Sequence, residues 1–424
     1  MSPVSEESSA QGKGRRGLRL GLRIGALAAA VALLVPLVPW PSASVVVPSL
    51  SPFVAASGAL AARAVSTAAL IALPVLVMAI LRGRWFCRWL CPVGLLAEQA
   101  GRVGLGRASW TARVPRVGRG IVLLTLGGAC LGYPLLLWLD PLAFFSGAFG
   151  VLHKPLAVGG TASAALLGGV IALGLILPGA WCGRLCPLGA TQELLAAWKG
   201  LFRRPELPGE GGRPVVRRAW LRLAPGALLA AAGAGLALLV RRVALGRSDP
   251  PIRPPGALDE GRFAGVCVRC GNCLRACPTR ILRPDLAPGH PEGWLAPVVV
   301  FEDDYCREDC TACSQVCPSG AIAHLSPKAK RRVAMGMARV ELEFCFLSND
   351  HECQICRRHC PFDAIAYAWD EAAYSRTPVV DADRCTGCGA CEVACPCTSG
   401  EGPTPRRKAI RVVPRRAVLA APHA

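Results

Sequence analysis

The sequence from Cys267 to Pro278, Cys-Val-Arg-Cys-Gly-Asn-Cys-Leu-Arg-Ala-Cys-Pro, separates four cysteines by two, two and three residues and ends them with a proline. The same spacing recurs from Cys385 to Pro396. Two variants lie between these stretches, from Cys306 to Pro318 and from Cys345 to Pro361, with a first gap of three and of seven residues. The chain therefore contains four cysteine groups that end in Cys-Pro and recur about every 40 residues, which indicates tandem copies of one structural unit.

This spacing is typical of bacterial [4Fe–4S] proteins, in which three close cysteines ligate one cluster and the fourth ligates the neighbouring cluster. Zinc sites usually place two Cys-x-x-Cys pairs a dozen or more residues apart, so they do not explain four contiguous ligands. We therefore predict four [4Fe–4S] clusters. Their ligands are the sixteen cysteines Cys267, Cys270, Cys273, Cys277, Cys306, Cys310, Cys313, Cys317, Cys345, Cys353, Cys356, Cys360, Cys385, Cys388, Cys391 and Cys395.

Apolar residues and one further thiol accompany these groups. An isoleucine follows each Cys-Pro, and we expect the four to shield the clusters from water; they are Ile281, Ile322, Ile365 and Ile410. Cys397 is a surplus thiol beside the fourth group and is either a spare ligand or buried.

The positive charge of the chain is confined to its first part. Of the net charge of +20, residues 1–254 contribute +19, with 27 Lys/Arg against 8 Asp/Glu, whereas residues 255–424 have 21 against 20. The basic part also contains the long apolar segments, which is typical of a membrane protein with basic cytoplasmic loops and not of a nucleic-acid-binding surface.

Five segments are apolar and long enough to cross a bilayer, which takes roughly 20 residues. They are Leu20–Trp40, Ala61–Leu81, Gly120–Leu139, Gly159–Ala180 and Leu221–Val240. The segment Val45–Leu60 is interrupted by Pro48 and Pro52, and we expect it to be a loop or a re-entrant segment. Most Lys and Arg of this part lie on the same side of the spans as the N-terminal tail, so the positive-inside rule places the N-terminus in the cytoplasm and the chain after the fifth span outside it.

The membrane part contains an internal repeat. The second span ends in Cys87-Arg-Trp-Leu-Cys91-Pro92 and the fourth in Cys182-Gly-Arg-Leu-Cys186-Pro187, so that one Cys-x-x-x-Cys-Pro motif follows each of the two spans. Further upstream the correspondence continues, with Ser51-Pro52 and Ser57-Gly58 matched by Asp140-Pro141 and Ser146-Gly147.

These four thiols are a candidate redox or metal site. Cysteines four residues apart share one face of a helix, and two such pairs related by a repeat can converge. The cytosol keeps thiols reduced, so a disulfide is not expected there. Buried apolar packing is the alternative interpretation, and the pattern does not specify what Cys87, Cys91, Cys182 and Cys186 bind.

The motifs resemble two known families joined in one chain. Residues from about 20 to 200 resemble the H subunit of periplasmic nitrate reductase systems, a membrane quinol-oxidising protein with paired Cys-x-x-x-Cys-Pro motifs. Residues from about 213 to 416 resemble the G subunit of those systems and the methylamine-utilisation ferredoxin, which have four [4Fe–4S] clusters after a twin-arginine signal. Here Arg217-Arg218 precede an apolar run, similar to such a signal retained as the fifth span.

The resemblance also implies a pairing of the clusters. In four-cluster subunits of this kind the outer cysteine groups pair with each other, as do the inner groups. Cys277 would then ligate with Cys385, Cys388 and Cys391, and Cys395 with the first group, whereas pairing of sequential groups remains the alternative. The chain also departs from the H subunit, because it lacks that subunit's cytoplasmic ferredoxin groups after the last span.

These observations predict a membrane α-helical bundle of about five transmembrane helices, followed by an α+β ferredoxin-like domain of four [4Fe–4S] half-units. The expected divisions are a cytoplasmic basic tail at 1–19, a four-helix membrane domain at 20–200, a basic loop with the twin-arginine-like helix at 201–248, a Pro-rich linker at 249–262 and the four-cluster domain at 263–416.

We expect no haem or nucleotide cofactor. The sequence has no Cys-x-x-Cys-His motif for a c-type haem. The histidines that stand near features of interest, His153, His351 and His359, are expected to be surface or structural residues. A quinone site cannot be located from the sequence; loops near Asp140 or Glu193 are only suggestions.

The leading hypothesis is an electron-transfer protein of the bacterial inner membrane with quinol dehydrogenase-type activity. It would pass electrons from the quinone pool through its clusters to a periplasmic oxidoreductase or cytochrome. The alternative hypothesis is a maturation or regulatory protein that supplies electrons for metal-centre assembly, in which the Cys-x-x-x-Cys-Pro pairs handle a metal such as copper.

Overall fold

The computed structural model describes residues 3–35, 41–104, 106, 108–152, 158–202, 213–245, 250–347, 351–371, 374–398 and 408–415. The chain forms two compact units. The helical unit comprises Met1–Arg242, Gly261–Asn272 and Pro318–Ala321, and the cysteine-rich unit comprises Val243–Glu260, Cys273–Cys317 and Ile322–Ala424. The first cysteine group is therefore divided, with Cys267 and Cys270 in the helical unit and Cys273 and Cys277 in the cysteine-rich unit.

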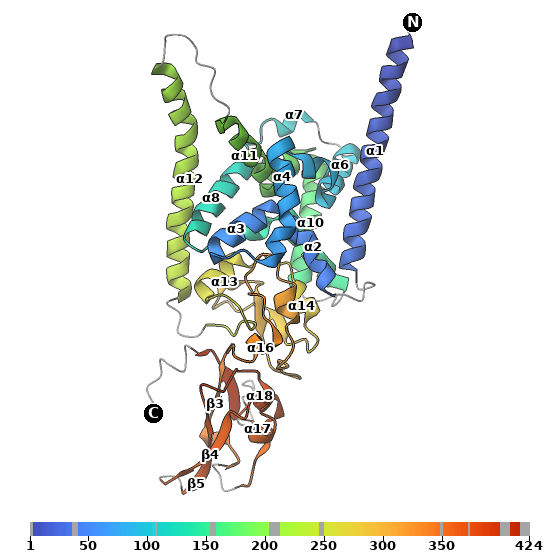
Figure 1. The fold of residues 1–424 in the computed structure, drawn as a ribbon. Helices are drawn as coiled ribbons and strands as arrows, with labels where there is room; N and C mark the ends of the chain where they lie inside the picture. Colours follow the sequence, from blue (N-terminus) through green and yellow to red (C-terminus); the bar gives the residue numbers. More distant parts are fainter. Residues whose placement is uncertain are drawn as a thin grey trace. The chain divides into compact units, whose positions relative to one another are not determined.

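The helical unit is built from helices of very different lengths (Figure 1). They are α1 (Pro3–Leu34), α2 (Val46–Ser49), α3 (Pro52–Ala62), α4 (Leu73–Arg82), α5 (Trp85–Trp89), α6 (Pro92–Val103), α7 (Ala108–Thr111), α8 (Val117–Cys130), α9 (Pro141–Ala148), α10 (Val158–Ile176), α11 (Pro187–Phe202), α12 (Arg213–Leu245) and α13 (Glu260–Val266). A 3₁₀ helix, Thr67–Ala72, leads into α4, and a π-helical turn, Trp181–Leu185, precedes α11.

Three helices of the described residues are long and apolar enough to cross a membrane, against the five spans predicted from the sequence. They are Gly17–Leu34, Val158–Ile176 and Ala224–Leu245, which correspond to the first, fourth and fifth predicted spans. The second and third predictions were too long, because a 3₁₀ segment makes Thr67–Arg82 shorter than a full span and α8 ends at Cys130 before a turn. The twin arginines Arg217 and Arg218 belong to the backbone of α12, and their side chains lie outside the described residues.

The predicted re-entrant segment is a bent helix pair. Ala43–Ser49 and Pro52–Ala62 meet at 93°, and together they are long and apolar enough to count as one broken span. The bend follows from the sequence, since Ser51 adopts an extended conformation as the N-cap of α3 and Pro52 starts that helix. The helical unit thus has three or up to four candidate spans.

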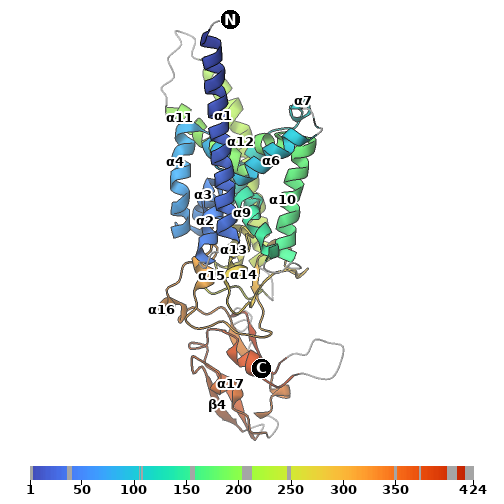
Figure 2. The same ribbon diagram turned by 90° about the vertical axis from the view of Figure 1, so that its right-hand side faces the viewer.

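The internal repeat forms two corresponding sets of helices, and helices of one set pack on helices of the other, as α4 with α11 and α10 with α6 in Figure 2. The first set is α3, α4, α5 and α6, and the second is α9, α10, the π-helical turn and α11. Helix α4 packs on α11 of the other set, and α10 packs on α6. Each Cys-x-x-x-Cys-Pro motif is thereby held between helices of both repeats.

The two repeats are also joined by their helix caps. Ser51 caps α3 and Asp140 caps α9, and the Ser51 Oγ lies 2.5 Å from Asp140 Oδ2. The other oxygen of Asp140 accepts hydrogen bonds from the amides of Leu142 and Ala143, each at 3.0 Å. The Ser-Pro and Asp-Pro pairs matched in the sequence are therefore equivalent caps in direct contact.

The cysteine-rich unit contains three antiparallel strand pairs and short helices (Figure 1). The strands are β1 (Leu282–Pro284) with β2 (Pro297–Val299), β3 (Met337–Val340) with β6 (Ile410–Val413), and β4 (Ile365–Asp370) with β5 (Ser375–Val380). The short helices are α14 (Asn272–Ala276), α15 (Ala312–Gln315), α16 (Pro327–Lys330), α17 (Ile355–Arg358) and α18 (Ala390–Ala394). The pairing of β3 with β6 closes the second half of the unit over its cysteines.

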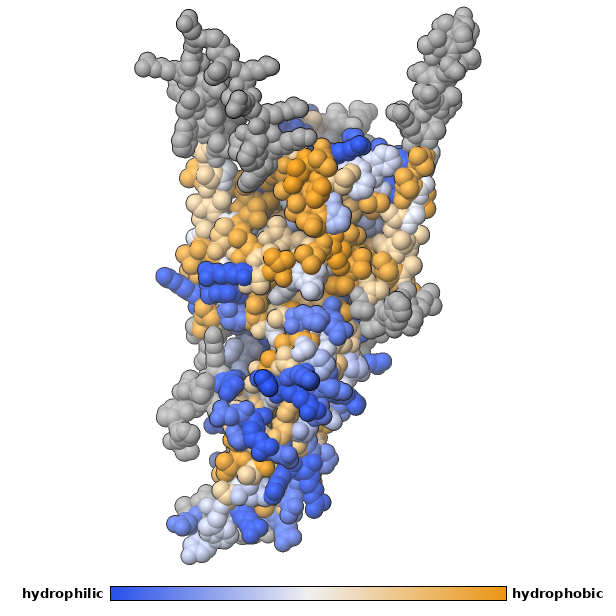
Figure 3. Space-filling model, in the orientation of Figure 1, coloured by the Kyte–Doolittle hydropathy of each residue, from blue (hydrophilic) through white to orange (hydrophobic). Residues whose placement is uncertain are grey.

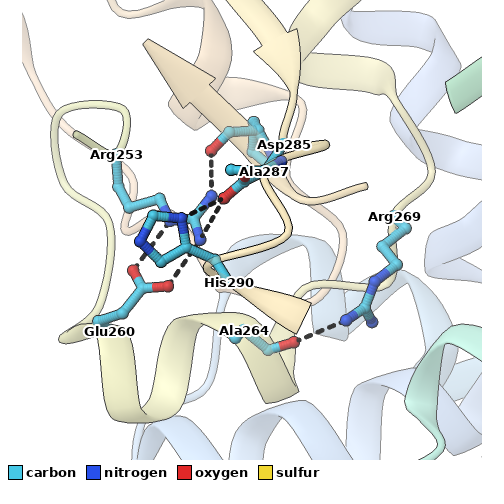
Figure 4. A network of polar contacts seen from close by, with 8 residues as sticks. Arg253, Glu260, Ala264, Arg269, Asp285, Ala287 and His290 are labelled. Atoms are coloured by element: carbon cyan, nitrogen blue, oxygen red, sulfur yellow. Dashed lines mark hydrogen bonds and ion pairs between the residues drawn. The ribbon is translucent and has the colours of Figure 1, made fainter. Parts of the chain in front are cut away.

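The segment predicted as a Pro-rich linker is packed into this unit. Arg253 is 6% exposed and forms ion pairs with Glu260 at 2.6 Å and with Asp285 at 3.3 Å (Figure 4). Its Nη1 also donates to the Pro297 carbonyl at 3.0 Å. A buried guanidinium is stable only when such partners replace water, so this network fixes the segment after residue 250 to the strands β1 and β2.

Surface hydropathy differs between the two units. The surface over the helices of the helical unit is largely hydrophobic, whereas that over the cysteine-rich unit is largely hydrophilic (Figure 3). Large apolar side chains with more than half of their area exposed include Leu70, Leu73, Leu81, Ile176 and Leu228, all of the helical unit. Exposed apolar surface of this extent is typical of contact with lipid rather than water.

Candidate iron–sulfur sites

Each of the four cysteine groups has the same local structure. The third cysteine lies in a short helix, and the fourth follows within two residues of the end of that helix, before its proline; the third cysteines are Cys273 in α14, Cys313 in α15, Cys356 in α17 and Cys391 in α18. A proline at this point diverts the chain and turns the fourth thiol away from the other three. The geometry predicted from the spacing is thus present in all four groups, including the two with altered first gaps.

The second group surrounds a cavity together with a cysteine of the first group. Cys306, Cys310 and Cys313 line it with Cys277, and the other walls include Ile281 and Val299. Burial, together with the neighbouring thiols Cys306, Cys310 and Cys277, raises the pKa of Cys313 to about 12. Four thiols brought together in this way are thiolates near neutral pH only when a cationic centre offsets their charge, as iron does.

A buried lysine, Lys330, lies beside Cys306 of the second cysteine group. Lys330 is 5% exposed, its ammonium donates to the Arg307 carbonyl, and it hydrogen-bonds Cys306. Burial raises the pKa of Cys306, whereas the charge of Lys330 lowers it. A buried lysine is rare unless it is paired, so an anionic cluster is a suitable neighbour for it.

The fourth group forms an equivalent arrangement with Cys360 of the third group. Cys360, Cys385, Cys388 and Cys391 line one cavity with Ala338, Ile365 and Val412. Burial, together with the charges of Cys360 and Cys385, raises the pKa of Cys388 to about 11. In the third group, burial and the charges of Cys345, Cys353 and Cys395 raise the pKa of Cys356. Cys395 of the fourth group therefore lies near the cysteines of the third group.

This arrangement differs from the pairing implied by the family resemblance. Cys277 lies with the second group rather than with Cys385, Cys388 and Cys391, and Cys395 lies with the third group rather than the first. Sequential groups therefore exchange their fourth cysteines. The physical reason is the chain length between groups, since a short connection through β1 and β2 brings Cys277 to the next group without crossing the other half of the unit.

The shielding residues predicted from the sequence are all buried. Ile281, Ile322, Ile365 and Ile410 are between 2% and 4% exposed. Ile281 packs in a cluster with Cys273, Cys277, Cys306 and Cys313, and Ile365 and Ile410 pack with Cys360, Cys385, Cys391 and Cys395. The surplus thiol Cys397 is 5% exposed, consistent with the buried alternative.

The first two cysteines of the first group pack inside the helical unit. Val268 and Cys270 belong to the same apolar cluster as Phe53 of α3 and Val122 of α8. Asn272 fixes this segment, because it accepts a hydrogen bond from Ser146 Oγ at 3.0 Å and donates one to the Ser44 carbonyl at 3.1 Å. The start of the cysteine-rich sequence is therefore part of the core of the apolar helices.

Two glycines of the repeat, Gly58 and Gly147, leave space for the loops that pack against the apolar helices. A Cβ placed on Gly58 would lie 2.6 Å from the carbonyl oxygen of Ser319, which follows Cys317-Pro318. A Cβ on Gly147 would lie 2.5 Å from Ser163 Oγ and 3.6 Å from the Arg269 carbonyl oxygen. The Ser-Gly pairs found in both repeats thus receive the loops next to cluster ligands.

The four thiols of the Cys-x-x-x-Cys-Pro motifs converge. Cys91 and Cys186 are buried, Cys87 and Cys182 are half-buried, and all four lie in one apolar cluster. A charge on Cys186 would interact with charges on Cys87, Cys182 and Cys91. The repeat therefore gathers both pairs, as the sequence predicted.

Hydrogen bonds hold these thiols in a symmetric frame. Cys91 and Cys186 occupy the residues before α6 and α11, and they accept from the amides of Gly94 and Gly189 respectively. Across the repeats, Gln192 Nε2 donates to Cys87 Sγ at 3.2 Å and Arg84 Nη1 donates to the Cys182 carbonyl at 2.8 Å. Donors that point at sulfur are the usual means of tuning an iron–sulfur or metal centre.

Apart from Glu193, which was suggested only as a position near a quinone, the charged residues near this site were missed by the sequence analysis. Glu98 and Glu193 stand seven residues after Cys91 and Cys186, a repeated spacing that could have revealed them. Glu98 pairs with Arg23, and Glu193 pairs with Arg84 at 2.9 Å. Arg23 and Arg84 both act electrostatically on Cys182, so they favour a negative charge there.

Within the described parts of the chain, no three His, Cys, Asp or Glu side chains are grouped as ligands of a single metal ion.

The other residues singled out in the sequence have structural surroundings. Asp140 is completely buried and its oxygens bond Ser51 and the start of α9, so it caps a helix rather than facing a quinone. His359 Nδ1 lies 2.9 Å from the Ile355 carbonyl, and the ring of His351 lies 5.7 Å from that of Phe346. His153 lies outside the described residues.

Comparison with protein families identifies both halves of the chain. A family described as a 4Fe-4S binding domain matches residues 66–112 and 160–205, which contain the two Cys-x-x-x-Cys-Pro motifs. A family described as a 4Fe-4S dicluster domain matches residues 266–321 and 351–399. The first dicluster match contains the first and second cysteine groups, and the second contains the fourth group and the third group without Cys345.

Curated relatives are ferredoxin-type proteins. The Escherichia coli ferredoxin-type protein NapG is 37% identical over 175 residues, which cover 39% of this chain and 74% of the relative. The methylamine utilization ferredoxin-type protein MauM of Paracoccus denitrificans is 36% identical over 225 residues, which cover 50% of this chain and 93% of the relative. NapF of Escherichia coli is 32% identical over 145 residues, or 34% of this chain and 80% of NapF.

No solved structure matches this chain. The relatives are matched over most of their own length at more than 30% identity, and the cysteine groups supply the ligand set that [4Fe–4S] binding needs. From these matches and from the paired thiol sites, we conclude that the chain belongs to the family of iron–sulfur ferredoxin-type proteins that includes NapG and MauM.

Proposed function

We propose that this protein takes electrons from quinol in the bacterial inner membrane and passes them through four [4Fe–4S] clusters to a periplasmic oxidoreductase. Oxidation of one quinol yields a quinone, two protons and two electrons, and each cluster accepts one electron at a time. The cysteines that would hold three of the clusters are Cys277 with the second group, Cys395 with the third and Cys360 with the fourth. Cys267, Cys270, Cys273 and Cys317 are the remaining predicted ligands.

The observation that supports this route is the packing of Cys270 and Val268 among the apolar helices. A ferredoxin domain that was connected to the membrane helices only by a flexible linker would have all of its cluster ligands in its own core. Here two ligands of the first group belong to the helical unit together with the Cys-x-x-x-Cys-Pro thiols. Electrons that leave the apolar helices therefore have the first group as their nearest ferredoxin-type acceptor within that unit.

We further propose that Cys87, Cys91, Cys182 and Cys186 hold an additional iron–sulfur centre. The match of these segments to a 4Fe-4S binding family supports this assignment, as do the sulfur-directed donors and the arginines beside Cys182. When bound, such a centre supplies one-electron transfer. The residues of this chain position its ligands and offset its negative charge.

The proposal is tested in membrane vesicles that contain the protein with its clusters oxidised. Addition of menaquinol or ubiquinol should produce the EPR signals of reduced [4Fe–4S] clusters within the time of mixing and freezing. If neither quinol reduces the clusters while dithionite does, quinol is not the donor, and a role in metal-centre assembly becomes the better hypothesis.

A further inference from the structure

A cavity of about 430 Å³ lies beside the Cys-x-x-x-Cys-Pro thiols, entirely within the helical unit. It is lined by the two half-buried thiols Cys87 and Cys182, whereas Cys91 and Cys186 lie behind them. Its volume falls in the range of small-molecule sites, roughly 300–1,000 Å³. A molecule in this cavity would therefore meet the side of the thiol site that is open.

The cavity wall contains buried hydrogen-bond donors that are not used. Trp181 lines the cavity, and its indole Nε1 is buried and has no hydrogen-bond partner among the described residues. The Trp181 ring is held edge-on against Phe144, with centroids 5.9 Å apart at 70°. Arg23 Nε is also buried without a hydrogen bond. Buried donors without partners are rare, so both groups indicate a bound acceptor.

The same cavity also contains an acceptor. Glu98 of α6 lines the same cavity, and its carboxylate is held by Arg23 and, at 2.7 Å, by Arg102. Small residues Gly94, Ala97 and Gly101 of α6 lie alongside it. The cavity thus offers donors, an acceptor and a wall without bulky side chains, which suits a flat ring with an oxygen at each end.

Five arginines line the cavity; three of them are paired with carboxylates, and Arg19 donates to the Arg88 carbonyl at 3.1 Å. Arg84 is paired with Glu193, and Arg23 and Arg102 are paired with Glu98. Arg23 and Arg84 also act on Cys182, where an iron–sulfur centre would place negative charge. A neutral ligand with one oxygen that accepts and one hydroxyl that donates fits the remaining groups.

We infer that this cavity binds the quinol headgroup, with Trp181 donating to one quinol oxygen and Glu98 accepting from the hydroxyl at the other end. This inference rests on the proposed function, because it assigns a position to the quinol that the function requires. It places the headgroup next to Cys87 and Cys182, so the bound ring and the proposed centre share one wall.

The test is the binding of the fluorescent quinol analogue 2-heptyl-4-hydroxyquinoline N-oxide to the cluster-loaded full chain in detergent, followed by fluorescence quenching. Trp181→Phe removes the indole donor and keeps the aromatic ring, and Glu98→Gln removes the carboxylate and keeps the shape. Loss of one hydrogen bond should weaken binding about fivefold in each variant. Trp89→Phe is the matched control, because Trp89 lines the neighbouring cavity formed by Arg19, Arg82 and Arg88 and not this one.

The possible outcomes distinguish an error in the position of the quinol site from an error in the proposed function. Iron and acid-labile sulfide per chain must equal the wild-type values in all variants, so that weaker binding reflects the cavity and not cluster loss. If Trp181→Phe and Glu98→Gln bind the analogue as the wild type does while quinol still reduces the clusters, the quinol site is elsewhere and this inference is wrong. Displacement of the analogue by inorganic phosphate, lost in the same variants, would instead identify an anion site and also overturn it. If quinol fails to reduce the wild-type clusters, the proposed function fails whatever the variants bind.

Discussion

At the scale of single residues, the cysteines define the sites, and their neighbours set the electrostatics. Lys330 beside Cys306 and Gln192 beside Cys87 are polar groups that a search for cysteine spacing does not find. Neither residue belongs to a motif, and both reach sulfur from segments that are distant in sequence. Their contribution is to favour extra negative charge on a cluster, which raises its reduction potential.

Replacement of Lys330 by Met should lower the reduction potential of one cluster. The variant loses a buried positive charge next to Cys306, so the reduced and more negative state becomes less favourable, by on the order of 100 mV. An EPR-monitored redox titration measures this shift. Lys328→Met on the same short helix is the control, since Lys328 is exposed and should leave every potential unchanged. Equal shifts in both variants would contradict a local effect of Lys330.

At the scale of elements, the short helices and the connections between them decide which cysteines share a cluster. The fourth cysteines Cys277, Cys360 and Cys395 each lie with the group next to their own in the sequence, so the third and fourth groups are mutually dependent. The same scale includes the helix caps and the Ser-Gly pairs, where the two repeats of the helical unit form corresponding contacts.

The pairing of groups predicts which thiol is exposed when one cluster is lost. In the triple variant with Cys306, Cys310 and Cys313 changed to Ala, Cys277 should lose its cluster and react with iodoacetamide, because its partners are gone. Peptide mass spectrometry of the native chain after alkylation measures this, with Cys360 as the internal control that should stay protected. If Cys277 remains protected in the triple variant, it ligates with a different group and sequential pairing is wrong.

The contact at Gly58 predicts a loss of stability on a small substitution. Gly58→Ala would place a Cβ 2.6 Å from the Ser319 carbonyl oxygen, so backbone must shift, and we expect a cost of roughly 1–3 kcal/mol. Thermal unfolding of the detergent-solubilised protein measures the change. Gly169→Ala in α10 is the matched control, because nothing lies within 4 Å of its added Cβ, and a helical Gly to Ala change is neutral or stabilising. A variant at Gly58 as stable as this control would contradict the close approach.

At the scale of the whole molecule, two kinds of iron–sulfur sequence stand in one chain, one within apolar helices and one in a hydrophilic unit. The boundary between the two units falls inside the first cysteine group, with Cys267 and Cys270 in one unit and Cys273 and Cys277 in the other. Predictions at this scale concern the total content of iron and the side of the membrane on which each part lies.

Iron content distinguishes four clusters from five. Four cubanes contain sixteen irons, and an additional [4Fe–4S] centre at the Cys-x-x-x-Cys-Pro thiols would bring the total to about twenty per chain. In the double variant Cys87→Ser, Cys182→Ser, the content per chain should then fall by about four irons and four acid-labile sulfides. Wild type and double variant with the same content of about sixteen would show that these thiols hold no such centre.

Topology follows from the distribution of basic residues. We expect a reporter enzyme that is active only in the periplasm to be active when fused after residue 415, and inactive when fused after Leu195 in α11. The positive-inside rule places these two positions on opposite sides of the membrane. Activity of the reporter at Leu195 and not after residue 415 would reverse the orientation and place the cysteine-rich unit in the cytoplasm.

The sequence alone was sufficient to predict iron–sulfur binding by cysteine groups, the internal repeat and the apolar character of the first part. These features depend on residue identity over short distances, since a cubane needs thiolates at close spacing and a helix cap needs Ser or Asp before Pro. Spacing alone also predicted that the third cysteine of each group would lie close to the first two, and it identified the four buried isoleucines.

Only the tertiary structure decided what depends on distant contacts. It set the lengths of the apolar helices, because a 3₁₀ segment and an early helix end are stabilised by neighbours in the other repeat. It assigned Cys277, Cys360 and Cys395 to their sequential neighbours, and it turned the Pro-rich segment into part of a packed unit through the ion pairs of Arg253. It also placed Trp181 and Glu98 in one cavity beside Cys87 and Cys182. These residues come together because helices of the two repeats pack on each other.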